Sequence, residues 1–337
     1  MQMPGEVLLL KMWETLIEKG IGGLIYPYYT VWKNKKLTLG AIELDKISRI
    51  AISEGEKEIA ELNNNEINLI GYESTASVEN ESGTSVRDTV LSHDIKRLIR
   101  AEINVVKAIN HANGRLIEDV SDLPKEEVSQ DWLNTWRDNA SKVTDEEVQS
   151  LWGNILAQEF LEPGRYSLRL LEFLKTMSKS DALLVEKLAP YYSELGIIYG
   201  RVTEGSFVAS NDNFLEASKM TRGELNLLEE IGIISGVSTL GVVQELLNIR
   251  KVDEAGFLSF ILVSEKALMI SSKSLNENVK LLCYKVTKVG KEVLSLITYE
   301  TKPSHLKWLA DQLTDDYQVT ICEKIDNNFK PIFIFND

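Results

Sequence analysis

Apolar and polar positions alternate with the period of an α-helix through most of the first half of the chain. Apolar residues recur there at three- and four-residue spacings, which is typical of helices that bury one face. This pattern predicts helices over residues 6–19, 41–62, 86–112 and 129–143. Because Asn113-Gly114 is a typical helix end, we expect the third of these helices to stop there.

Short polar residues that stand three positions before an acidic residue mark further helix starts. Thr144-x-x-Glu147 predicts a capping box for a helix that ends at Glu162-Pro163-Gly164. Ser178-x-x-Asp181 predicts a second box, and the residues between the two predict a helix over 167–177. Since the connections are short, residues 86–200 are predicted to form an antiparallel helical bundle.

The segment 63–85 breaks this pattern. It is rich in Asn, Ser, Glu and Gly and has no helical period, so it predicts a linker or a mobile loop. A structured insertion is the alternative. The predicted organisation is therefore a helical segment over 1–62, the linker over 63–85, the bundle over 86–200 and a further domain over 201–337.

Past about residue 200, helices and strands mix. Thr221-x-x-Glu224 predicts a short helix that ends at Gly232, and Thr287 predicts the cap of a helix through Ile297. A helix is also predicted over 304–314. Apolar runs predict strands over 257–263, 267–271, 280–286, 318–325 and 330–335, the last two as a terminal hairpin.

The order of elements over 201–297 is winged-helix-like. The expected fold is mainly α with an α+β C-terminal domain: an antiparallel helical bundle, a winged-helix-like domain and a terminal β-hairpin. Winged helices often read DNA through a basic recognition helix. In the corresponding predicted helix, 221–231, Arg222 stands against Glu224, Glu229 and Glu230, which is the wrong sign for phosphate contact.

Among the features of composition, the net charge says most about which partners the protein can bind. The chain has 337 residues with 37 Lys and Arg against 51 Asp and Glu, a net charge of −14. An acidic surface repels phosphate backbones and anionic lipids, so nucleic acid is a disfavoured partner unless a local basic patch overrides the mean. No apolar run reaches the roughly 20 residues of a spanning helix, and the first residues lack the basic stretch of a secretory signal. We therefore expect a cytoplasmic protein.

Residues suited to catalysis or metal binding are few. His93 and His111 lie on one predicted helix, about 27 Å apart along its axis, so they cannot share a site. We expect these two and His305 to be solvated or capping imidazoles, and Cys283 and Cys322 to be buried free thiols. Because spaced metal ligands and a phosphate-binding loop are missing from the sequence, we expect no cofactor. A cryptic metal-dependent nuclease, with carboxylates gathered in space, stays open.

An aromatic and basic cluster near the N-terminus is the first candidate for partner contact. It consists of Trp32, Lys33, Lys35 and Lys36, preceded by several tyrosines. Aromatic rings beside lysines suit a peripheral membrane contact or a protein partner. Packing of the aromatic rings against the helices is the alternative.

Three stretches of the helical region resemble a known family. They are Asp131-Trp132-Leu133, then Asp145-Glu146-Glu147-Val148-Gln149-x-Leu151-Trp152-x-x-Ile155-Leu156-Ala157-x-Glu159, and Pro163-Gly164-x-x-Ser167-x-Arg169-x-Leu171-x-x-Leu174. On these residues the chain resembles the bacterial family catalogued as domain of unknown function 2806 (DUF2806), and it is distantly similar to abortive-infection alpha proteins. The resemblance is strong over about residues 95–190 and weaker through the helix TKVGKEVL. It implies a bacterial, often prophage-linked protein with a role in phage defence, and it implies no catalytic residues.

The turn inside this signature is the second candidate for partner contact. Glu159 and Arg169 flank the Pro-Gly turn and are placed to pair, with Ser167 as the cap of the second helix. One hypothesis is that these residues only set the fold. The other is that Glu159, Arg165 and Arg169 form a corner that binds a partner or ligand.

Together these patterns favour a non-enzymatic interaction protein that binds a protein partner or itself. The helical bundle would serve assembly, and the C-terminal domain would serve recognition. The alternatives are a nucleic-acid-binding regulator that uses the winged-helix-like domain and the cryptic nuclease.

Overall fold

The computed structural model describes residues 4–19, 86–118, 124–203, 206–208, 211–239, 241–246, 250–251, 257–263, 266–272, 279–314, 317–325 and 328–335. The predicted helix 41–62 and linker 63–85 lie outside these residues. The chain divides into two compact units, Met1–Lys175 and Thr176–Asp337, and each is described by itself. The domain limits predicted from the sequence stay predictions.

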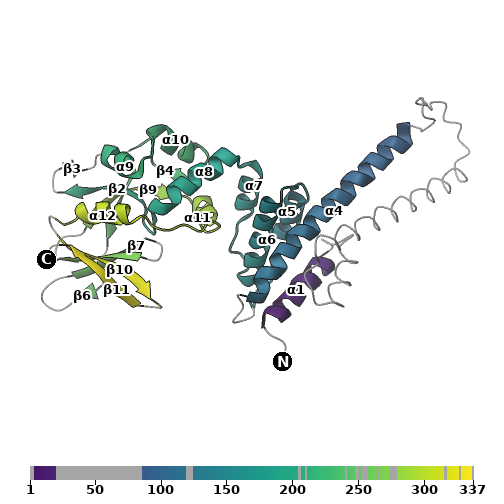
Figure 1. The fold of residues 1–337 in the computed structure, drawn as a ribbon, viewed down its shortest axis with the longest axis horizontal. Coiled ribbons are helices and arrows are strands. Elements are labelled where there is room, and N and C mark those ends of the chain that lie inside the picture. Colours follow the sequence, from purple (N-terminus) through teal and green to yellow (C-terminus); the bar gives the residue numbers. More distant parts are fainter. Residues whose placement is uncertain are drawn as a thin grey trace, which may run out of the picture. The chain divides into compact units, whose positions relative to one another are not determined.

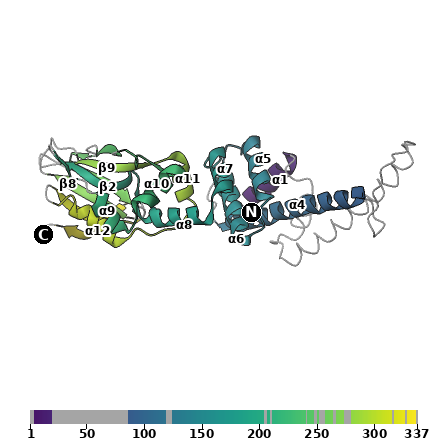
Figure 2. The same ribbon diagram turned by 90° about the horizontal axis from the view of Figure 1, so that it is seen from above.

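The first unit is built from helices (Figure 1). They are α1 (Pro4–Glu18), α4 (Val86–Glu118), α5 (Gln130–Ala140), α6 (Glu146–Leu161) and α7 (Leu168–Thr176). The predicted helical ranges are thus confirmed where the structure describes them. In both views α4 extends well past α5 and α6 at its N-terminal end (Figure 1 and Figure 2).

The predicted end of the long helix at Asn113-Gly114 is wrong. Helix α4 continues through both residues to Glu118. Asn113 is fully buried, its side-chain amide donates to Asn110 Oδ1 at 3.3 Å, and Leu116 beyond it is also fully buried. Burial of this last stretch supplies more stabilisation than the roughly 1 kcal/mol that one helical glycine costs, so packing overrides the local stop signal.

The start of α6 is also one residue later than predicted. Asp145, not Thr144, is the cap: its backbone is extended and its carboxylate accepts a hydrogen bond from Val148 N at 3.1 Å. Aspartate is a better cap than threonine and also suits the positive end of the helix dipole. The predicted capping boxes at Ser178 and Thr221 are confirmed, each with both reciprocal hydrogen bonds.

Helices α4 and α6 pack unusually closely. Gln149 of α6 donates to Asn104 Oδ1 of α4, and Gly153 lies against Ala108, so the contacts advance by four residues along each helix and the two helices run parallel. A Cβ atom at Gly153 would lie 2.5 Å from the Ala108 carbonyl oxygen and 2.6 Å from His111 Cβ. Only glycine permits this approach of two backbones.

The indole groups of α5 donate hydrogen bonds to carbonyl groups of α6 and of the turn that follows it. Trp136 Nε1 donates to the carbonyl of Trp152, and Trp132 Nε1 donates to the carbonyl of Tyr166, each at 2.9 Å. Both tryptophans are buried. Their hydrogen bonds remove the cost of burying a polar N–H, so α5 is fixed to α6 and to the turn that follows it.

The second unit combines helices with two antiparallel sheets (Figure 1). Its helices are α8 (Lys179–Leu188), the 3-10 turn η1 (Ala189–Tyr191), α9 (Asn211–Ser218), α10 (Arg222–Glu230), α11 (Lys288–Leu294) and α12 (Pro303–Asp311). The chain is therefore mainly α, with antiparallel sheets in the C-terminal half, as the sequence predicts.

In the first sheet, β2 (Gly196–Thr203) and β9 (Val279–Val286) pair along the middle. Short strands β1 (Tyr192–Ser193) and β3 (Ser206–Val208) pair with β2. On its other side β9 pairs with β4 (Ile234–Ser235) and β5 (Val242–Leu246). Strand β9 is thus the centre of this sheet, and β5 joins it from the side opposite β2.

The second sheet has the order β11-β10-β8-β7-β6. Its strands are β6 (Arg250–Lys251), β7 (Phe257–Val263), β8 (Lys266–Ser272), β10 (Gln318–Ile325) and β11 (Asn328–Phe335). The predicted strand pair 257–263 and 267–271 and the terminal hairpin are confirmed. Alternate residues of β7 and β8, such as Ile261 and Leu268, are fully buried with Leu306 and Leu309 of α12 in one core.

Strand β2 was not predicted from the sequence, because Gly200 interrupts the apolar run of its residues, GIIYGRVT. The pairing of β2 with β9 shifts register between Ile198 and Gly200. A glycine inside a strand often marks such a bulge. The bulge explains why strict alternation of apolar and polar residues is missing here.

We predict that Gly153→Ala destabilises the helical unit by about 1–3 kcal/mol, because the added methyl group overpacks the α4–α6 contact. This loss exceeds the gain of up to roughly 1 kcal/mol from alanine's better helix propensity. Urea unfolding followed by tryptophan fluorescence measures the difference. Ser150→Ala on the same helix is the matched control and should change little; an unaltered or more stable Gly153→Ala protein would show that the contact can relax.

Candidate functional surfaces and buried polar groups

The turn between α6 and α7 is organised by a buried carboxylate. Glu159 is 2% exposed, its Oε1 accepts from Gly164 N at 2.7 Å, and its Oε2 accepts from Tyr166 N at 2.9 Å. Gly164 has φ 86°, in the left-handed region that favours glycine. The carboxylate therefore binds two backbone amides of the segment that follows α6, and it fixes the shape of the Pro-Gly turn.

Arg165 and Arg169, the two arginines of the predicted partner-binding corner, do not share the buried surroundings of Glu159. Arg165 and Arg169 are exposed, whereas Glu159 is buried. Arg165 forms an ion pair with Glu162 at 2.9 Å, and its guanidinium lies 5.5 Å from the centroid of the Tyr166 ring. Ser167 Oγ accepts from Leu170 N at 3.3 Å, which confirms it as the cap of α7. The buried carboxylate thus serves the backbone, and the partner-binding role of Arg165 and Arg169 stays a prediction.

The N-terminal cluster of Trp32, Lys33, Lys35 and Lys36 lies outside the described residues. Its predicted contact with a partner or membrane therefore stays a prediction. Across the helices that the structure describes, none is both long enough and apolar enough to cross a bilayer.

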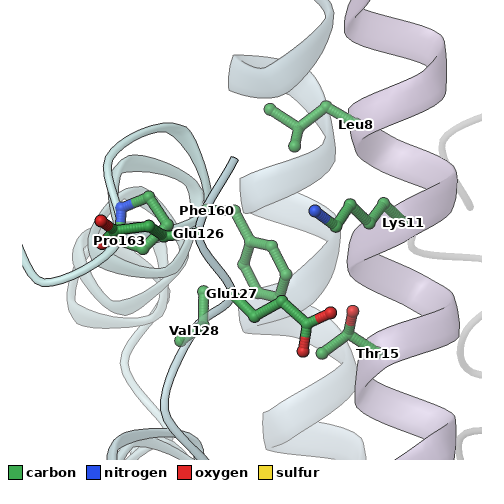
Figure 3. A pocket seen from close by; sticks show the side chains of 8 residues that line it. All are labelled: Leu8, Lys11, Thr15, Glu126, Glu127, Val128, Phe160 and Pro163. Atoms are coloured by element: carbon green, nitrogen blue, oxygen red, sulfur yellow. The ribbon is translucent and has the colours of Figure 1, made fainter. Parts of the chain in front are cut away.

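A small hollow lies beside α1 in the helical unit (Figure 3). Leu8, Lys11 and Thr15 of α1 line one side, and the other side is formed by Glu126, Glu127, Val128, Phe160 and Pro163. The space has room for about one water molecule. Small-molecule sites typically enclose about 300–1,000 Å³, so this hollow does not have the dimensions of a ligand pocket.

The three histidines lie on two helices of the described structure, α4 and α12. His93 and His111 both lie on α4, as predicted, and its geometry separates them by about 27 Å along the axis. His305 was expected to be solvated or to cap a helix, and this is wrong: it is 2% exposed inside α12. The burial of His305 could not be predicted from the sequence, because histidine is found at buried and at exposed positions.

Aromatic rings surround His305. Tyr191 and Phe214 meet it edge-on with ring centroids 4.9 and 6.4 Å away, and Trp308 stacks on it at 5.7 Å. Neither ring nitrogen has a hydrogen-bond partner. Burial, aided by the nearby Lys302 ammonium, lowers the pKa of His305 to about 4. The imidazole is therefore neutral at pH 7 and acts as a core side chain.

The two cysteines are free and buried, as predicted. Burial raises the pKa of the Cys283 thiol to about 12, so it holds its proton and is a poor nucleophile. Within the described ranges, no three His, Cys, Asp or Glu side chains come together as potential metal ligands.

One of the three acids expected on the surface of α10 is bound to backbone amides. Glu229 turns back to the loop after the helix, where its carboxylate accepts from the backbone amides of Gly236, Val237 and Ser238 at 2.5, 2.9 and 2.8 Å. Although partial burial raises it, these hydrogen bonds leave the pKa of Glu229 below its ordinary value. Sequence reading assigned this acid to the solvent face, because the loop that it binds could not be located from spacing alone.

Two other charged residues of α10 also have partners. Glu224 forms an ion pair with Lys187 of α8 at 2.6 Å, and Arg222 donates to the carbonyl of Val237 at 3.2 Å. Asn226, Leu227 and Glu230 are exposed on the same helix, and Leu227 is 51% exposed. The solvent side of α10 therefore presents an apolar side chain among polar ones.

Comparison with known proteins identifies one family. The family described as "Protein of unknown function (DUF2806)" matches residues 95–310, which is more than half of the chain. No curated protein and no solved structure matches the chain.

We predict that Glu159→Gln lowers the free energy of unfolding of the helical unit by about 2–3 kcal/mol. The substitution weakens charge-assisted hydrogen bonds and turns an amide donor toward a backbone N–H, which leaves buried groups unpaired. Chemical denaturation followed by circular dichroism measures the loss. Glu162→Gln, three residues on at a side chain that is 69% exposed, should change stability by less than about 0.5 kcal/mol. Equal effects of the two variants would contradict a structural role for Glu159.

The stability of the C-terminal unit should fall with acidity because of His305. Its pKa in the folded state, about 4, lies below the ordinary value of 6.5, so its contribution is complete above pH 6.5 and is lost as the pH falls toward 4. The expected loss between pH 7.5 and 5.5 is about 1 kcal/mol. His305→Phe should flatten this dependence in urea titrations, whereas His111→Gln on α4 should not. A His305→Phe protein with the wild-type pH dependence would refute the assignment.

Proposed function

The chain belongs to the DUF2806 family, and we propose that it is a non-enzymatic interaction protein whose C-terminal unit recognises a protein partner. The observation that carries this proposal is the chemistry of α10. Its exposed side presents Leu227 with Asn226 and Glu230, while Arg222 and Glu224 are held by neighbouring groups. An exposed leucine among polar residues suits a protein surface better than a phosphate backbone.

The order of elements around α10 supports a winged-helix-like organisation. Two consecutive helices, α9 and α10, are followed by β4 and β5, and β9 lies between β2 and β5 in the sheet. In such folds the second helix of the pair is the one that contacts a partner. The proposal therefore assigns recognition to the same element that other winged helices use for DNA.

The edge of the first sheet offers a second apolar feature to a partner. Val242 and Val243 of β5 are 37% and 51% exposed, and β5 is paired with β9 on one side. Leu183 of α8, which is joined to α10 by the Lys187–Glu224 ion pair, is 57% exposed. Exposed valines and leucines on neighbouring secondary-structure elements are a common feature of protein interfaces.

A role in a bacterial or prophage system, in phage defence or abortive infection, is part of the same proposal. It rests on the resemblance of the helical signature over residues 131–174. Plating phage on cells that carry or lack the gene tests this setting directly. Equal plaque numbers and equal cell survival across a broad phage panel would contradict it.

We predict that Leu227→Lys reduces partner capture at least tenfold. The change places a charge where an apolar side chain would be buried in the complex, and an interface centre tolerates this poorly. Tagged protein is recovered from phage-infected cells and its partners are quantified by mass spectrometry, and self-association is measured by analytical ultracentrifugation. Leu168→Lys on α7, at a leucine that is 44% exposed, is the matched control. A monomer at micromolar concentration that captures nothing, or equal losses in both variants, would refute the proposal.

DNA reading through α10 is the alternative that the element order favours. It requires Arg222 to contact phosphate, so Arg222→Glu should abolish DNA binding if the alternative holds. Binding that survives this substitution would exclude α10 as the DNA-reading helix.

A further inference from the structure

Strand β5 is an edge of the first sheet. It pairs with β9 in a continuous register, from Val242 opposite Cys283 to Leu246 opposite Val279. Among the strands that the structure describes, β5 has no second neighbour. Every second residue of such an edge directs its backbone N–H and C=O groups away from the sheet, so the edge is a template for another extended chain.

Side-chain exposure shows that this edge is open on both faces of the sheet. Val242 and Val243 are both exposed, although consecutive residues of a strand point to opposite faces. Their direct neighbours on β9, Cys283 and Leu282, are buried. Apolar burial is thus lost across a single strand spacing. One more strand beside β5 would cover both valines.

The other edge strands of the two sheets carry features that hinder further pairing. Strands β1, β3, β4 and β6 have only two or three residues each. Strand β11 contains Lys330 and Pro331, and the register of its pairing with β10 shifts beside Pro331. Strand β5 has five residues, without lysine, proline or a register shift. Among the described strands it is therefore the edge best suited to accept another strand.

The start of β5 is fixed before any partner binds. Gly241, with φ 72°, donates its N–H to the carbonyl of Gly236 at 3.0 Å. A Cβ atom at Gly241 would lie 2.7 Å from the Tyr199 hydroxyl and 2.8 Å from the Cys283 carbonyl oxygen, so β5 begins in close contact with β2 and β9. Glu229 of α10 also binds the amides of the preceding loop. Because this edge is preformed, a strand that adds to it binds at a lower ordering cost.

We propose that the edge of β5 binds an extended segment of a partner protein, which adds to the first sheet as a further strand. The inference rests on the proposed function and names the form in which the partner is bound. Two adjacent apolar residues of the segment, β-branched ones above all, would cover Val242 and Val243 on the two faces. Proline would be excluded from the bound stretch, because it cannot donate to the ladder.

Charge favours a basic segment over a second copy of this chain. Each copy carries a net charge of −14, so two copies repel one another, whereas a segment with lysine or arginine is attracted. Glu245 is exposed on β5 and lies opposite Lys280 of β9 in the register. A basic residue on the other side of Glu245 would continue the alternation of charge across three strands. The segment that fits is therefore extended, with two adjacent apolar residues and a lysine or arginine.

The test selects peptides from a random seven-residue phage-display library on the immobilised full chain at 150 mM KCl. Enriched sequences should contain two adjacent β-branched or aromatic residues close to a lysine or arginine, without proline in this stretch. The most enriched peptide is labelled with fluorescein, and its affinity is measured by fluorescence anisotropy. Val243→Lys should weaken binding at least tenfold, because it places a protective lysine on the edge and repels a basic segment.

A matched variant and a modified peptide series separate strand addition from other contacts. Leu168→Lys makes the same change in charge at an exposed leucine of α7 and should keep the affinity within about twofold. Circular dichroism verifies that each variant is folded. Methylation of the peptide's backbone nitrogens, one at a time, should weaken binding at every second position, since only alternate amides of an added strand face β5.

Five results would overturn the proposal. They are no enrichment over an empty support, enriched peptides that share only basic residues, equal affinity of the wild type and Val243→Lys, loss of binding at adjacent methylated positions instead of alternate ones, and a dimer of the unliganded protein that Val243→Lys converts to a monomer in analytical ultracentrifugation. The last result would assign the edge to a second copy. Partner capture in Leu227→Lys is a separate measurement, so the proposed function and this inference fail independently.

Discussion

The segments that join helices carry backbone amides that need hydrogen-bond partners, and in this protein carboxylates bind several of them. Glu159 binds the amides of the α6–α7 turn, and Glu229 binds three successive amides after α10. Asp145 caps α6 in the same way. Because an unpaired buried amide costs about 1–3 kcal/mol, these carboxylates fix the turns that join the helices.

This use of carboxylates changes how the acidic composition should be interpreted. Several acids are bound to the chain's own backbone or to a lysine, as Glu224 is to Lys187, so these carboxylates also stabilise the fold. The formal charge of −14 is therefore not a measure of how many acids face solvent without a partner. The surface is acidic on average and apolar at Leu227 of α10.

The two units differ in how they are built and in the surfaces that they present. The helical unit is held together by the close contact of α4 and α6 at Gly153. The C-terminal unit presents Leu227 and the edge strand β5 from a scaffold whose centre is β9.

The sequence by itself determined most helices and the capping boxes at Ser178 and Thr221, because these depend on residues a few positions apart. It also determined the hairpins over 257–272 and 318–335, where apolar runs flank short turns. It could not determine that α4 continues through Gly114, that β2 contains a bulge at Gly200, or that His305 is buried. Nor could it locate the amides that Glu159 and Glu229 bind. Those features depend on contacts between residues far apart along the chain, whose burial and hydrogen bonds outweigh local preferences of about 1 kcal/mol, so only the tertiary structure decided them.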